Sequence, residues 1–231
     1  MHSQTANVVE NTHQGEPVSA WVFDLDGTLS DPLEGMLASI NHALESINYQ
    51  PVSAAQMRLH IGPPLELTLA EFAGTDDEET IRLLIERYRS HYKETGYAQN
   101  SLYPGIVDFL QELASRELPM GVCTAKTAPV AIRILEHFGI DHYFGFVSGG
   151  DVGITKSSQL EKLLAEGAID EYALMLGDRR YDLEAAHANR LRCCAVSWGY
   201  GSEQELQEQS PHFTVQNPKG LFDLLPGGHP S

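Results

Sequence analysis

The sequence predicts an α/β protein in which helices cover both faces of a parallel sheet and a helical block interrupts the chain after the first strand. From residue 103 onward, helical and strand-like segments alternate, which is typical of repeated βα units. The apolar run Trp21–Phe23 is expected to form a buried strand far ahead of this series. Between the two, residues 31–100 show helical periodicity and no convincing strand. The first strand is therefore expected to join a sheet that is completed much later in the chain.

Three helices are expected in the interrupting block. Apolar residues at helical spacing predict a helix over Leu33–Ile47. The tandem prolines of Ile61–Pro64 break this pattern, and a second helix is expected over Leu65–Phe72. The acidic turn Thr75–Glu79 precedes a third helix over Thr80–Glu94, because negative charge at a helix start complements the helix dipole.

The alternating part of the chain supplies the remaining helices and strands. We expect helices over 106–115, 128–138, 159–166 and 183–189, and strands over 119–123, 144–148, 172–176 and 192–196. Helical crossovers join strands that run in the same direction, so these strands are expected to be parallel.

The composition is ordinary for a soluble globular enzyme. The 231 residues can bury one sizeable core, or a core plus a smaller insertion. A formal net charge of −17 argues against nucleic acid and against an anionic membrane as partners. A small anionic substrate stays compatible with this charge, because a bound divalent cation reverses the local field. No apolar stretch approaches the length that spans a bilayer.

The cysteines predict a reducing environment. Cys123, Cys193 and Cys194 lie in apolar segments and are not spaced like a metal site or a disulfide framework. Their odd number, without a signal peptide, predicts a cytoplasmic protein. We interpret the adjacent pair as buried thiols of a strand rather than as a redox pair. Residues 1–17 are polar and aperiodic, so a mobile tail is expected there.

The most informative segment is Asp24-Leu-Asp-Gly-Thr-Leu-Ser-Asp31, which directly follows the first strand. Ligand sites of open α/β sheets lie at such strand ends. Strand alternation places Asp24 and Asp26 on the same side of the backbone, and Gly27 permits a sharp turn. Two carboxylates this close repel each other unless a cation or a proton lies between them. The alternative for this segment alone is an acidic turn after a strand.

Polar residues at other strand ends complete a set suited to phosphoryl transfer. Thr124 follows one apolar strand, Lys156 precedes a helix, and Asp178 and Asp182 lie in Gly177-Asp-Arg-Arg-Tyr-Asp182 after another strand. In a parallel sheet these ends converge on one edge. Carboxylate oxygens in such a cluster suit Mg²⁺, which also accepts water and substrate phosphate as ligands.

In this order, the four motifs resemble those of the haloacid dehalogenase superfamily of phosphotransferases across residues 19–182. They match D-x-D-G-T, an apolar run followed by threonine or serine, a lysine, and G-D-x-x-x-D. The segments Trp198–Gly201 and Ile61–Leu65 are similar to those of the phosphoglycolate-phosphatase-like branch. There is little room for a second insertion between Thr124 and Lys156.

The resemblance implies a Rossmann-like parallel sheet core with an inserted α-helical cap. The core would comprise residues 18–31 and 101–225, and the cap residues 32–100. Residues 1–17 and 226–231 would be tails.

The resemblance also implies roles for the four aspartates. Asp24 would attack phosphorus and form an aspartyl-phosphate. Asp26 would protonate the leaving oxygen and then activate water. Asp24, the backbone carbonyl of Asp26, and Asp178 would hold Mg²⁺, with Asp182 in support.

The resemblance implies that other residues bind the phosphoryl oxygens. Thr124 and Lys156 would bind them, together with Ala125 in the loop after Thr124, and Lys156 would offset the charge of the nucleophile. Lys126 either approaches the phosphate or is a solvated loop lysine. Lys162 is a poorer alternative to Lys156, because it lies in the middle of a helix.

The cap of such enzymes supplies contacts to the substrate. Arg58 is the candidate we single out, because a guanidinium pairs with carboxylate or phosphate; the alternative is a surface arginine at a helix end. The other cap candidates are Met36, Asn41 and His60. Arg179 and Arg180 either take part in the site or pair structurally with a carboxylate. The histidines lack metal-ligand spacing, and three are interpreted as structural: His137, His142 and His187.

These observations predict a Mg²⁺-dependent phosphatase acting on a small phosphorylated metabolite, with phosphoglycolate as the leading substrate. A 5′-nucleotidase and a sugar-phosphate mutase of the β-phosphoglucomutase type are the enzymatic alternatives. Asp26 favours phosphatase or mutase within the superfamily, and the segment Cys123–Lys126 is closer to the phosphatase motif. A non-catalytic binding protein on the same scaffold would lack Asp24, Asp26 or Asp178, and all three are present. We expect a monomer or a homodimer.

Overall fold

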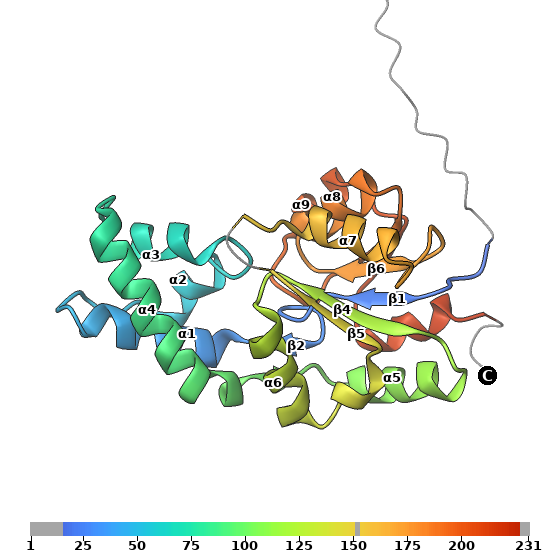
Figure 1. The fold of residues 1–231 in the computed structure, drawn as a ribbon, viewed down its shortest axis with the longest axis horizontal. Helices are drawn as coiled ribbons and strands as arrows, with labels where there is room; N and C mark the ends of the chain where they lie inside the picture. The colour runs from blue at the N-terminus through green and yellow to red at the C-terminus, as the bar shows by residue number, and fades with distance from the viewer. Residues whose placement is uncertain (1–15, 151–152, 227–231) are drawn as a thin grey trace, which may run out of the picture.

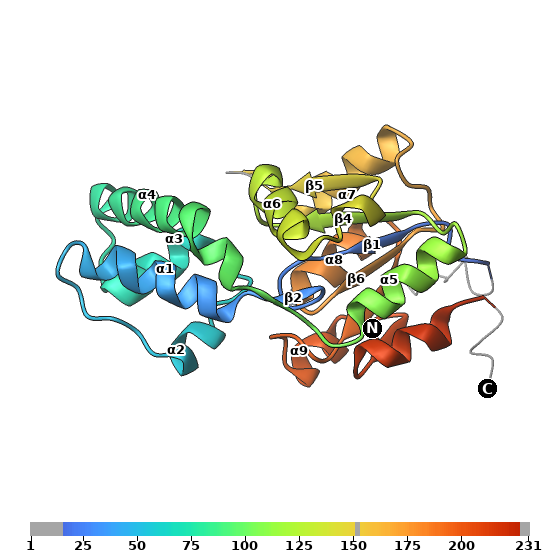
Figure 2. The ribbon, with the colours of Figure 1, turned by 90° about the horizontal axis from the view of Figure 1, so that it is seen from below.

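The computed structural model describes residues 16–150 and 153–226. They form an α/β core and a helical part that lies to one side of it (Figures 1 and 2). The expected N-terminal tail, except for its last two residues, lies outside the described residues. So does the expected C-terminal tail, except for its first residue.

Within the described residues, a six-stranded parallel sheet forms the core, in the order β5-β4-β1-β6-β7-β8. The strands are β1 (Trp21–Phe23), β4 (Met120–Thr124), β5 (Phe146–Gly149), β6 (Leu174–Gly177), β7 (Arg192–Val196) and β8 (Phe213–Val215). Trp21 is in register with Met120 of β4 on one side and with Leu174 of β6 on the other. The prediction that the first strand joins a sheet completed much later is therefore confirmed.

Helices cover both faces of this sheet, with α7, α8 and α9 on one face and α5 and α6 on the other (Figure 1). They are α5 (Ile106–Ser115), α6 (Ala128–Phe138), α7 (Lys156–Ala165), α8 (Arg180–Ala188) and α9 (Glu203–Glu208). Alternate residues of β1 serve the two faces: Trp21 and Phe23 pack with α5 and α6, and Val22 packs with α7 and α8. The ring of Trp21 meets that of Phe109 edge to face, with centroids 5.2 Å apart. Burial on both faces explains the continuous apolar runs of the strands.

The helical part between β2 and β3, here called the cap, is built from residues 32–100. Its elements are α1 (Leu33–Glu45), α2 (Ala54–Arg58), α3 (Leu65–Ala73), α4 (Glu78–Glu94) and the short 3₁₀ helix η1 (Gly96–Gln99). Helices α1 and α3 both pack against α4. The buried apolar residues of this layer include Ile40, Leu44, Leu69 and Leu84.

Local signals set the helix starts within the cap. Ser53 and Gln56 form a reciprocal capping box at the start of α2. Asp77 accepts the backbone N–H of Thr80 at 2.8 Å and begins α4.

Two short strands connect the cap to the core (Figure 2). β2 (Ser30–Asp31) pairs antiparallel with β3 (Ser101–Leu102), so the chain enters and leaves the cap side by side. The expectation that residues 31–100 contain no strand is wrong at Asp31. A ladder two residues long carries no periodicity that a sequence pattern could show.

Several helix boundaries differ from the prediction. Helix α1 ends at Glu45 rather than Ile47, and α8 begins at Arg180 rather than at Leu183. Helix α7 begins at Lys156, because the Thr155 side chain accepts the N–H of Ser158. The sequence analysis also missed the short elements α2, α9 and β8. Among the described residues, no helix is both long enough and apolar enough to cross a membrane.

Candidate active site

The polar residues predicted to converge do meet at the carboxyl edge of the sheet. Asp24 follows β1, Thr124 ends β4, and Asp178 follows β6. The backbone N–H of Asp24 donates to the carbonyl of Leu176 at 2.9 Å, which continues the ladder between the two central strands to the residue after β1. Lys156 enters from the first turn of α7, and its Nζ lies 3.0 Å from Oδ1 of Asp24.

Three buried carboxylates form the centre of this edge. Carboxylate oxygens of Asp24, Asp178 and Asp182 all lie within 4.8 Å of one another. Asp178 and Asp182 are fully buried, and Asp24 is 7% exposed. The backbone N–H of Tyr200 donates to Asp178 at 2.8 Å, and that of Arg179 donates to Asp182 at 3.0 Å. These bonds fix the two carboxylates in place.

The cluster carries more negative charge than the protein neutralises. Burial and the charges of Asp182 and Asp24 hold the pKa of Asp178 well above its usual range. Burial likewise raises the pKa of Asp182 to about 6, although its ion pair with Lys156 acts in the opposite direction. Three carboxylates therefore face one lysine, and a divalent cation would relieve their repulsion.

Glycines allow the carboxylates to approach the backbone. Gly27 has φ +82, and a Cβ there would collide with the carboxylate of Asp178. A Cβ at Gly177 would collide with the carboxylate of Asp182. These close approaches need the absence of a side chain. Hard oxygen donors held this closely fit Mg²⁺, as the sequence predicts.

Lys156 is the cation of this cluster. It forms an ion pair with Asp182 as well as with Asp24, and its side chain is 9% exposed. Burial lowers its pKa, but the charges of Asp182 and Asp24 outweigh this effect and raise it above the usual range. The alternative lysine, Lys162, is exposed, and its Nζ lies 3.7 Å from Oε1 of Glu166, one helical turn away.

The side chain of Asp26 points to a different partner. Its Oδ2 lies 2.5 Å from Nζ of Lys126, and its Oδ1 has no hydrogen-bond partner among the described residues. Burial raises the pKa of Asp26, with Lys126 opposing that shift. The Asp26 carboxylate therefore does not belong to the carboxylate cluster. Its backbone carbonyl stays a predicted metal ligand.

Lys126, whose place the sequence left undecided, lies beside Asp26 in the candidate site. Its side chain is 12% exposed, so it is not a solvated loop lysine. Its Nζ lies 4.8 Å from the ring centroid of Tyr92, which comes from α4 of the cap. The signal in the sequence was its position two residues after Thr124, on the loop at the carboxyl edge.

Thr124 and Ala125 lie at the end of β4. Thr124 is 1% exposed, and its hydroxyl accepts the backbone N–H of Lys126 at 3.3 Å. Gln159 of α7 donates to the carbonyl of Thr124 at 3.2 Å. Ala125 is exposed on the following loop. The hydroxyl thus lies at a fixed strand end, and the loop beyond it is accessible.

The cap candidates have different surroundings. Arg58 is exposed at the end of α2, and its guanidinium carbon lies 5.9 Å from the ring centroid of Tyr200 in the core. Asn41 bonds the backbone of Val52 through both its oxygen and its nitrogen. Nε2 of His60 lies 3.1 Å from Oε2 of Glu71. Asn41 and His60 therefore make contacts within the cap, and Met36 packs against buried apolar side chains. Of the four candidates, Arg58 is the one that faces the core.

The two arginines of the fourth motif differ in their contacts. The guanidinium of Arg179 donates to the carbonyl of Ile61 in the cap and, at 2.9 Å, to Glu205 in α9. Arg180 is exposed and stacks on Tyr181. Arg179 thus fastens the cap to the loop that carries Asp178, a link that the sequence analysis did not find.

Comparisons with known proteins give the family of this chain. A model of the haloacid dehalogenase-like hydrolase family matches residues 21–196. The tyrosine-protein kinase PtkA of Mycobacterium tuberculosis is 36% identical over 217 residues, covering 91% of this chain and 72% of that protein. The 5′-nucleotidase of Pseudomonas aeruginosa is 34% identical over 208 residues, covering 88% and 94%. Phosphoglycolate phosphatase 1 of Pseudomonas aeruginosa is 30% identical over 219 residues, covering 89% and 78%.

The fold agrees as well. The crystal structure of a candidate phosphatase from Clostridium difficile superimposes with a TM-score of 0.83 at 30% identity, and the alignment covers 91% of this chain and 99% of that one. The match of the family model spans the motifs that carry Asp24, Thr124, Lys156 and Asp178. The chain therefore belongs to the haloacid dehalogenase-like hydrolase family.

Proposed function

We propose that this phosphatase hydrolyses a small phosphomonoester with Mg²⁺, through an aspartyl-phosphate formed on Asp24. The observation that carries the proposal is the position of Asp24. It directly follows β1, one of the two central strands, and shares the cluster of Asp178 and Asp182. Its Oδ1 lies 3.0 Å from Nζ of Lys156. A nucleophilic carboxylate beside a cation and further oxygen donors suits phosphoryl transfer, in which charge neutralisation and positioning dominate.

Asp24 and Asp26 divide the chemistry between them. In the first step, an oxygen of Asp24 bonds to phosphorus as the bond to the leaving oxygen breaks, and Asp26 gives that oxygen a proton. In the second step, Asp26 takes a proton from water, which attacks phosphorus and releases phosphate and Asp24. The raised pKa of Asp26 supports its role as the acid. Lys126 holds the Asp26 carboxylate in one orientation.

Asp24, Asp178 and Asp182, with the backbone carbonyl of Asp26, would hold the Mg²⁺ ion. When bound, Mg²⁺ neutralises charge on the phosphoryl oxygens and on the carboxylates. The hydroxyl of Thr124, the backbone at Ala125 and the Lys156 ammonium bind the phosphoryl group. Lys156 also orients Asp24 for attack.

Substrate choice is assigned to the cap. Arg58 comes from the cap and lies beside Tyr200, whose backbone N–H binds Asp178. A guanidinium there suits a substrate with a second anionic group, such as the carboxylate of phosphoglycolate. The 34% identity to a 5′-nucleotidase supports nucleoside 5′-monophosphates as the second candidate class. A sugar-phosphate mutase of the β-phosphoglucomutase type is the third.

The net charge and the free cysteines support the proposed partners and cellular location. The net charge of −17 supports a small-molecule substrate over nucleic acid or an anionic membrane. Cys123, Cys193 and Cys194 are buried free thiols, which supports a reducing cytoplasm. We propose that the enzyme works as a monomer or a homodimer.

A substrate panel tests the proposal. Phosphate release is measured with Mg²⁺ on phosphoglycolate, nucleoside 5′-monophosphates and hexose phosphates, and isomerisation of hexose phosphates is followed in parallel. Because one relative is named a tyrosine-protein kinase, ATP with a tyrosine peptide is included. Phosphate release that depends on Asp24 supports the proposal. Isomerisation without net hydrolysis, or peptide phosphorylation as the main reaction, would overturn it.

A further inference from the structure

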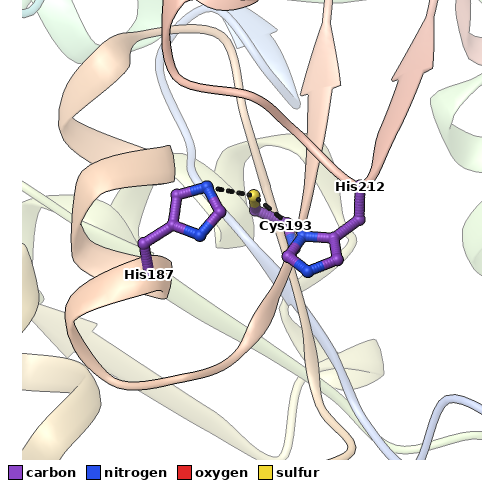
Figure 3. A group of neighbouring side chains, drawn as sticks. All are labelled: His187, Cys193 and His212. Carbon is purple, nitrogen blue, oxygen red and sulfur yellow. Dashed lines mark hydrogen bonds between the residues drawn. The ribbon is translucent and has the colours of Figure 1, made fainter. Parts of the chain in front are cut away.

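A second group of metal-ligating side chains lies away from the carboxylate cluster. His187 in the last turn of α8, Cys193 at the amino end of β7 and His212 just before β8 converge (Figure 3). Because the strands are parallel, the amino end of β7 is opposite the edge that carries Asp178. This group is therefore a separate site.

The two distances from the cysteine sulfur to the histidine nitrogens match those in a tetrahedral metal site. Nε2 of His187 lies 3.5 Å from Sγ of Cys193, and Nδ1 of His212 lies 3.4 Å from the same sulfur. All three ligand atoms lie within 4.8 Å of one another. Zinc bonds of about 2.3 Å to sulfur and about 2.0–2.1 Å to nitrogen place these atoms about 3.5 Å apart in a tetrahedron.

The present hydrogen bonds show what ligation would change. Nδ1 of His212 accepts the backbone N–H of Cys193 at 3.2 Å, so it carries a lone pair, which ligation would redirect from this N–H to the ion. Nε2 of His187 faces the carbonyl oxygen of Gln209 at 2.9 Å. Ligation requires the proton on this nitrogen to move to Nδ1 through solvent, which His187 contacts because it is exposed. The Gln209 oxygen, or water, then completes the coordination.

We propose that His187, Cys193 and His212 bind a thiophilic transition-metal ion, with Zn²⁺ as the best fit. A thiolate and two imidazoles select zinc over Mg²⁺ and Ca²⁺, which need oxygen ligands. Binding releases the thiol proton to solvent. The ion would join α8, β7 and the segment before β8, and so fasten the outer strand of the sheet. Helix α8 also carries Asp182 in its first turn.

The sequence hides this site because its ligands are not regularly spaced. His187 is six residues before Cys193. His212 is nineteen residues after Cys193, in the segment that precedes β8. Only the parallel pairing of β7 with β8 brings His212 next to Cys193. The exposed imidazole gives an ion access from solvent.

Cobalt titration of tag-free, reduced protein tests the proposal. Excess Mg²⁺ in the buffer occupies the carboxylate cluster, and Co²⁺ reports sulfur ligation through a thiolate-to-metal charge-transfer band and the strong visible bands of tetrahedral cobalt. We expect both signals to saturate at one ion per chain and to vanish on addition of one equivalent of Zn²⁺. Zinc should also raise the Tm by about 5 °C or more when it is well above its dissociation constant.

Matched variants distinguish this site from adventitious binding. Cys193→Ala should abolish the charge-transfer band. It should also weaken zinc binding by more than about 100-fold, which is the largest loss expected when a residue that only hydrogen-bonds a metal ligand is removed. His212→Ala should remove the tetrahedral signature. Cys194→Ala is the control, because Cys194 is the adjacent buried thiol and packs on the opposite face of the sheet. It should bind as wild type does.

Two results would overturn the proposal. One is a spectrum of the Co²⁺-loaded wild-type protein that lacks the thiolate-to-metal band. This result does not depend on whether any variant folds. The other is zinc affinity that is unchanged in folded Cys193→Ala, which would place the ion elsewhere.

Discussion

Nζ of Lys126 lies 2.5 Å from Oδ2 of Asp26, at the point where the core meets the cap. Both side chains are largely buried, and Tyr92 of the cap lies against the lysine. A buried carboxylate with one cationic partner keeps a defined orientation. This pair therefore links the position of the proposed general acid to the cap.

Lys126→Met should leave Asp26 without its partner and lower kcat. Because Lys126 acts through Asp26, the loss should be larger for alkyl phosphates, which need a proton on the leaving oxygen, than for aryl phosphates. It should not exceed the about 10²–10⁴-fold that general acid–base catalysis contributes. Steady-state kinetics on one substrate of each kind measure the difference. Equal losses on both would assign Lys126 to phosphate binding instead.

Asp26→Asn should impair both protonation of the leaving group and breakdown of the phosphoenzyme. With an activated aryl phosphate, part of the first step should survive, because a good leaving group needs less acid help. A rapid-quench experiment should therefore show a burst of the aryl alcohol followed by slow turnover. A variant with full steady-state activity would contradict the assignment of Asp26.

Chelation of divalent metal should abolish turnover. Among the described residues, Lys156 is the one cationic side chain paired with the cluster of Asp24, Asp178 and Asp182, so the site is under-neutralised without a metal ion. Dialysis against excess chelator should remove activity on an aryl phosphate, and Mg²⁺ should restore it where Ca²⁺ does not. Undiminished activity in chelator would contradict the metal assignment.

Substitutions in the cap and in the core should have different signatures. Arg58→Ala should raise KM for substrates with a second anionic group and alter the order of preference, while Mg²⁺ dependence is retained. Lys156→Ala should lower kcat for every substrate alike. The comparison uses several phosphomonoesters under identical conditions. If the two variants show the same substrate-independent loss, Arg58 does not determine specificity.

The convergence of Asp24, Thr124, Lys156 and Asp178 was predictable from sequence. Parallel strands end at one edge, so residues that follow them meet whatever the details of packing. Periodicity likewise indicated the longer helices, because one face of each is buried.

Other contacts could not be predicted, because they depend on side-chain direction and on loops. The sequence did not indicate that Asp26 turns to Lys126 rather than to the carboxylate cluster. Arg179 lies in the fourth motif, yet it reaches the carbonyl of Ile61 in the cap, 118 positions away. The group of His187, Cys193 and His212 depends on the order of neighbouring strands, which no local pattern specifies.

The central claim is that Asp24 carries the phosphoryl group. The most direct measurement is to trap the wild-type enzyme during turnover of a labelled phosphomonoester, reduce or digest it at low temperature, and locate the modified residue by mass spectrometry. We expect the modification on Asp24, and we expect Asp24→Asn to show none while it keeps its fold and loses several orders of magnitude in turnover. A modification on another residue, or substantial turnover by Asp24→Asn, would contradict the account.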